Sequence, residues 1–68
     1  MNKAIYKYVA MKLHHFGINM HGFWNGDQWV MHEIAAILYE KNIDAKITSD
    51  KHGGAGQFVK YAIYESPQ

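Results

Sequence analysis

The sequence contains no cysteine and no arginine, and it has one proline in 68 residues. The absence of cysteine excludes a disulfide framework and a thiolate zinc site. The absence of arginine removes the side chain that most often reads guanine edges in DNA. Because a chain of this length buries only a small core, we expect its stability to depend on aromatic packing or on self-association. We expect a homodimer.

Long apolar runs are also absent. No segment approaches the 18 apolar residues of a membrane span, and the N-terminus lacks the apolar stretch of a signal peptide. We therefore expect a cytoplasmic protein that does not bind membranes. What the chain does have is 49% hydrophobic and 15% aromatic residues with a formal charge of +1, which predicts one folded domain over residues 1–68.

The first segment has apolar residues at helical spacing, and we predict a helix over 3–16 that ends at Gly17. Its apolar stripe comprises Ile5, Val9, Leu13 and Phe16. The competing interpretation is a strand, because the side chains from Ile5 to Leu13 also alternate. A strand would be very long and would place Lys7 on its inner face, so we favour the helix. Residues 18–24 are predicted to be a short strand or a loop.

The Asn25-Gly26 pair fits either a hairpin turn or the start of a helix. We favour a helix over 27–41, because apolar residues follow at helical period. They are Val30, Met31, Ile34, Ile37 and Leu38. Alternating residues then predict strands over 43–49 and 57–65, joined as a hairpin by a Gly-rich loop. The predicted fold class is α+β: helix, short strand or loop, helix and β-hairpin, with an antiparallel sheet packed on the helices.

The sequence predicts no catalytic residues, no cofactor and no metal site, and hence a protein that is not an enzyme. No hydroxyl side chain has a base and an orienting group in a motif around it. Five histidines suggest metal binding, but none is paired at the spacing that a helical zinc site needs. A site assembled by the fold from His14, His21 and His32 stays an alternative.

The predicted helix 27–41 carries aromatic side chains on the side opposite its apolar stripe. A patch of Trp and Tyr around a small residue has the composition of a protein-binding hot spot. The predicted partner-binding residues are Trp29, His32, Ala36 and Tyr39, with Phe23 and Trp24 beside them. The alternative is that these rings pack against other parts of the domain.

The second functional hypothesis is a nucleic-acid-binding module, resembling a winged helix in its Gly-rich hairpin loop. Its candidate residues are Lys3, Lys7, Lys12, Lys51 and Lys60. The acidic residues of the predicted helix 27–41 argue against this hypothesis, because phosphates repel them. A variant places single-stranded bases on an outer sheet face with Phe58, Tyr64, Lys46 and Lys60.

The leading hypothesis is therefore a small non-enzymatic protein that occludes or bridges a protein partner. It rests on exclusion together with the aromatic patch. Compact cysteine-free chains without catalytic motifs are common among phage-type inhibitors of host or defence machinery, including anti-CRISPR proteins, and we place the chain in that functional class as a hypothesis.

Overall fold

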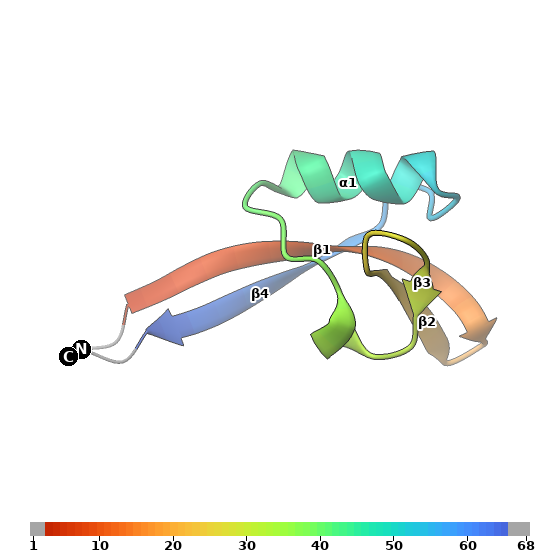
Figure 1. Ribbon diagram of the computed structural model, residues 1–68, viewed down its shortest axis with the longest axis horizontal. Coiled ribbons are helices and arrows are strands. Elements are labelled where there is room, and N and C mark those ends of the chain that lie inside the picture. Colours follow the sequence, from red (N-terminus) through yellow and green to blue (C-terminus); the bar gives the residue numbers. More distant parts are fainter. Residues whose placement is uncertain (1–2, 66–68) are drawn as a thin grey trace.

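The computed structural model describes residues 3–65, which form a four-stranded antiparallel sheet with the strand order β3-β2-β1-β4. One α-helix, α1, lies over one face of the sheet, and the 3-10 turn η1 lies on the other side (Figure 1). The elements are β1 (Lys3–Gly17), β2 (Met20–Trp24), β3 (Trp29–Val30), η1 (Glu33–Ala35), α1 (Asn42–Lys51) and β4 (Phe58–Glu65).

The prediction of a helix over 3–16 is wrong, because this segment is the long central strand β1. Its N-terminal half pairs with β4 from Lys3 to Ala10, and its C-terminal part pairs with β2. Val9 and Ala10 point to opposite faces, yet both have an exposed fraction of 0% because both faces are covered there. The alternation from Ile5 to Leu13 was thus the correct signal, and the competing helical spacing arose because apolar residues lie on both faces of this strand.

The prediction of a helix over 27–41 is also wrong. Asn25 does cap its turn, since its Oδ1 accepts hydrogen bonds from the backbone N–H groups of Asp27 and Gln28. The Asn25 N–H, however, donates to the Gln28 carbonyl at 3.1 Å, so the chain reverses and continues as β3 instead of a helix. Beyond η1 the chain is extended, and Tyr39 forms a two-way backbone bridge with Tyr8.

The predicted strand 43–49 is the helix α1 instead. Ala45 and Ser49 are one helical turn apart and fully buried against the sheet, and the Ser49 hydroxyl donates to the Met11 carbonyl at 2.8 Å. The isoleucines that suggested a strand, Ile43 and Ile47, are also one turn apart and remain about half exposed. The helix thus forms because its small residues fit the sheet, although its own sequence alternates like a strand.

The strand predicted over 57–65 is confirmed as β4, but its partner is β1 and not the segment 43–49. The Gly-rich loop therefore connects α1 to β4 instead of closing a hairpin. The likeness to a winged helix depended on that hairpin, so it no longer applies. The correct fold class is a four-stranded antiparallel sheet with a single α-helix among residues 3–65, not two helices packed on a hairpin.

The molecule is elongated and its core is small. The radius of gyration is 12.7 Å, whereas a compact domain of this length has about 11 Å. The buried hydrophobic residues are Val9, Ala10, Phe23, Trp24 and Ala45. Many large apolar side chains consequently remain at the surface. Within the described residues, no helix has the length and apolar character needed to cross a membrane.

Candidate functional site

The fold divides the predicted partner-binding residues between the two faces of the sheet. Trp24 and Trp29 are register partners in β2 and β3, with ring centroids 5.1 Å apart. His52, at the end of α1, stacks on Trp24 at 3.8 Å, and its carbonyl accepts a hydrogen bond from the Trp29 indole at 3.1 Å. These rings therefore join α1 to the sheet.

The remaining members of the predicted patch lie apart from these rings. Phe23 is buried, with an exposed fraction of 8%, and Tyr39 is held by its backbone bridge to Tyr8. His32 is exposed just before η1, and Ala36 follows η1. Because the segment 27–41 contains the short turn η1 instead of an α-helix, these residues do not share one helical face. Whether any of them contacts a partner stays a prediction.

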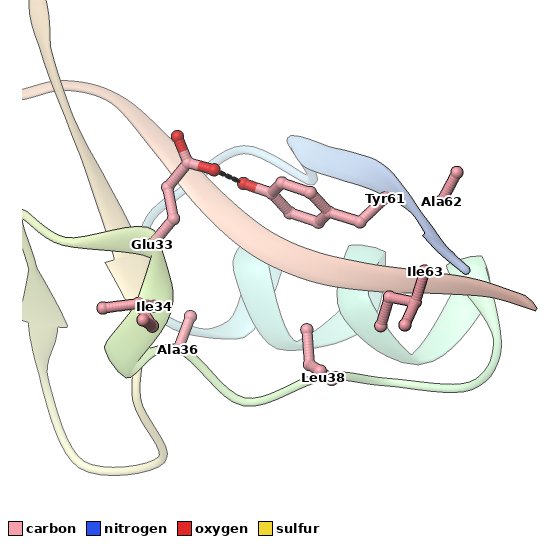
Figure 2. A pocket seen from close by; sticks show the side chains of 7 residues that line it. All are labelled: Glu33, Ile34, Ala36, Leu38, Tyr61, Ala62 and Ile63. Atoms are coloured by element: carbon pink, nitrogen blue, oxygen red, sulfur yellow. Dashed lines mark hydrogen bonds between the residues drawn. The ribbon is translucent and has the colours of Figure 1, made fainter. Parts of the chain in front are cut away.

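The structure instead presents an apolar pocket of about 380 Å³ between η1 and β4 (Figure 2). The segment from η1 to the extended chain forms one side, and three consecutive residues of β4 form the other. The lining residues are Glu33, Ile34, Ala36, Leu38, Tyr61, Ala62 and Ile63. Of the predicted partner-binding residues, the pocket includes Ala36 alone.

One polar contact fixes the pocket mouth. Figure 2 shows the Tyr61 ring extending toward η1, where its hydroxyl donates a hydrogen bond to the Glu33 carboxylate. Hydrogen bonds to ionised carboxylates are stronger than neutral ones, so this contact ties the turn to β4. The remaining lining is aliphatic apart from the Tyr61 ring.

Around the pocket lies a surface that we call the η1 patch, defined by Ile34, Ala36, Leu38 and Ile63. Ile34 is 97% exposed, Leu38 is 49% exposed and Ile63 is 37% exposed. The helical spacing of the sequence predicts Ile34 and Leu38 on the inner stripe of a helix. The structure turns them outward, and no signal in the sequence distinguishes the two cases, since an apolar side chain reads as core by default.

The lysines of the nucleic-acid hypothesis do not form one surface. Lys3 begins β1 and Lys51 ends α1. Lys7 is paired with Glu40 at 2.6 Å, and the Lys60 ammonium lies 4.3 Å from the centroid of the Tyr6 ring. A Cβ added at Gly53 would lie 3.8 Å from the Lys12 ammonium, which places Lys12 beside the α1–β4 loop.

The Lys7–Glu40 contact lowers the pKa of Glu40, first through the hydrogen bond that the Lys7 ammonium donates and second through its charge. A lowered folded-state pKa means that the stabilisation is present above the unfolded pKa of Glu and is lost as pH falls through the folded value. We expect an NMR titration of the Glu40 carboxyl carbon to show a midpoint below that of ordinary Glu. In Lys7→Met the midpoint should return to the ordinary range, and an unchanged midpoint would contradict the assigned cause.

The histidines are partly brought together. The His14 and His21 rings lie 5.4 Å apart, and His21 Nδ1 accepts a hydrogen bond from the His14 backbone N–H. In the part of the chain that the structure describes, no three His, Asp or Glu side chains gather closely enough to hold a metal ion. His32 is not joined to this pair by any hydrogen bond or ring contact within residues 3–65.

The chain was compared with protein families, curated proteins and solved structures. No protein-family description matches the chain, and neither a curated protein nor a solved structure matches it significantly. Function is therefore inferred from the geometry of the η1 patch and of the sheet.

Proposed function

We propose that this protein is a non-enzymatic binding module that occludes or bridges a protein partner, and that the η1 patch is its contact surface. The observation that carries the proposal is the exposure of Ile34, 97%, at the rim of an apolar pocket. Burying such a side chain in a partner is worth about 1.5–3 kcal/mol, which is the scale of an interface hot spot.

The surroundings of Ile34 fit a protein partner better than a small polar ligand. The pocket volume of about 380 Å³ suits one or two apolar side chains, and the Glu33–Tyr61 contact supplies a polar rim. An apolar centre with a polar edge is the usual composition of a protein-binding surface. The bound groups would be aliphatic or aromatic side chains that project from a partner surface.

The nucleic-acid alternative has one supporting feature. Tyr6 and Tyr64 are exposed on the same face of the β1–β4 ladder, next to Lys60. Such a face can stack unpaired bases, but binding also needs several cations along the phosphate path. Lys7 points to the opposite face of the sheet, where it pairs with Glu40, so Lys60 is the lysine of the ladder that lies beside these rings. Steep loss of binding with added salt would favour this alternative.

The test compares Ile34→Glu with the wild-type protein in affinity capture from the cells in which the protein is produced naturally, with the captured proteins identified by mass spectrometry. We expect a charge at the centre of the η1 patch to lower recovery of the specific partner by at least about tenfold, because a buried carboxylate without a counter-ion is strongly unfavourable.

Ile18→Glu is the matched control. Ile18 is 79% exposed in the turn between β1 and β2, far along the chain from the η1 patch, and the substitution makes the same chemical change. We expect this variant to capture the partner as well as wild type does. Equal capture by Ile34→Glu would show that the η1 patch is not the contact surface.

The proposal also includes two further parts. They are that the protein belongs to the phage-type inhibitors of host or defence machinery and that it acts in the cytoplasm.

A further inference from the structure

The strand β4 is the edge of the sheet, and half of its backbone groups point outward. Met11 donates to the Gln57 carbonyl at 3.0 Å, and the register continues without a shift to Lys3↔Glu65. Because bonding alternates along an antiparallel pair, Val59, Tyr61 and Ile63 bond to β1. The N–H and C=O groups of the even-numbered residues 58, 60, 62 and 64 therefore face away from the sheet.

This edge has few of the features that usually protect an edge strand. Its eight residues contain no proline and no glycine, and its pairing with β1 shows no bulge. Its single lysine, Lys60, lies over the Tyr6 ring on a face of the sheet instead of guarding the edge. A regular strand edge whose only charged residues are Lys60 and the terminal Glu65 is a template for another strand.

We propose that the protein forms a homodimer in which β4 pairs antiparallel with β4 of a second copy, with Ala62 opposite Ala62 at the two-fold axis. A two-fold axis perpendicular to the sheet requires one residue to face its own copy. Placing Lys60 there would oppose two like charges, whereas Ala62 is small and near the middle of the strand. Pairing at Ala62 forms about six new backbone hydrogen bonds.

Across this axis, the side chains of β4 are complementary to those of β4 in the second copy. Lys60 lies opposite Tyr64 of the second copy, which continues the cation–π contact that it already makes with Tyr6. On the other face, Tyr61 lies opposite Ile63 of the second copy, at the rim of the η1 pocket. Tyr64 and Ile63, 65% and 37% exposed, lose solvent-accessible area in the dimer.

The small core supplies the energetic reason for dimerisation. The chain is more extended than a compact domain of its length, with a radius of gyration of 12.7 Å. Pairing two copies lengthens one continuous sheet and covers apolar area that a single copy cannot bury. The two-fold axis also puts both η1 patches on the same face, so the dimer could bridge two sites of a partner. The dimer itself does not depend on the proposed function.

The first test is size-exclusion chromatography with light scattering on wild type and on Ala62→Pro, with circular dichroism to check folding. The Ala62 N–H faces outward, so proline leaves the β1–β4 bonds in place and blocks only the new edge. We expect a wild-type dimer and a folded monomeric variant. A wild-type monomer at millimolar concentration, or a folded Ala62→Pro dimer, would overturn the proposal.

Cysteine cross-linking tests the register, and it applies even if the proline variant fails to fold. The chain has no cysteine of its own, so each introduced thiol is unique. In the proposed pair, the two Cα atoms at position 62 are about 5.5 Å apart, within disulfide range. Ala62→Cys should therefore form a disulfide-linked dimer under mild oxidation.

Two further variants provide the control. Lys60→Cys and Tyr64→Cys should each stay unlinked alone, because equivalent positions are roughly 14 Å apart in this register. Mixed together, they should form a mixed disulfide, since Lys60 faces Tyr64 of the other copy. Absence of the Ala62→Cys product, or efficient linking of Lys60→Cys by itself, would contradict pairing at Ala62.

Discussion

Replacing Trp24 by alanine should remove much of the protein's free energy of unfolding. Trp24 is 9% exposed, packs edge-on against Trp29 and stacks on His52, so it joins β2, β3 and the end of α1. Deleting a buried Trp side chain costs about 3–5 kcal/mol. A chain of this length has a total free energy of unfolding of about 3–10 kcal/mol, so the loss removes much of it.

Urea denaturation followed by circular dichroism measures this effect, with His52→Ala as the matched comparison. His52 is exposed and touches Trp24 on one side, so its removal should cost about 1 kcal/mol. If Trp24→Ala unfolds at nearly the wild-type urea concentration, the ring does not anchor the helix to the sheet. Trp24 would then be available as a binding residue, as the sequence suggested.

Gly54→Ala should destabilise the protein strongly through a steric clash. A Cβ at this position would lie 2.6 Å from the Met11 carbonyl oxygen and would also collide with the Ser49 hydroxyl. The Gly54 N–H donates to the Ser49 carbonyl at 2.6 Å, and the Ser49 hydroxyl bonds to Met11, so the loop cannot move away without breaking these bonds. We expect a loss of about 2–4 kcal/mol, measured by thermal or urea unfolding.

Ala55→Gly tests the same loop, but this substitution is expected to leave the stability unchanged or to raise it. Ala55 has a φ of 58°, in the left-handed region that favours glycine, and its side chain is exposed. Glycine relieves strain of about 1 kcal/mol and partly offsets this gain by its greater freedom in the unfolded chain. The melting temperature should therefore stay level or rise slightly. For Gly54→Ala, a free energy of unfolding close to that of wild type would mean that the helix–sheet contact at Ser49 is not tight.

Sequence reasoning succeeded where local chemistry alone decides the outcome. The strand over 57–65 was predicted correctly from its alternating residues. The Asn25 side chain accepts the backbone bonds that its capping pattern suggested, although a strand follows instead of a helix. The predicted partner-binding residues stay a prediction, but the structure does not bring them together. Of six predicted partner-binding residues, Ala36 alone lines the η1 pocket, and Trp24 and Trp29 instead hold the helix on the sheet.

From the sequence we could predict a small chain without a disulfide framework, rich in aromatic residues, with a small core and an alternating strand near its C-terminus. The other elements depend on tertiary contacts. The segments 3–17 and 42–51 each carry apolar residues that fit both periods, and packing overrides such weak local preferences. β1 became a strand because β2 and β4 satisfy its backbone on both sides, and α1 became a helix because Ala45 and Ser49 fit against that sheet.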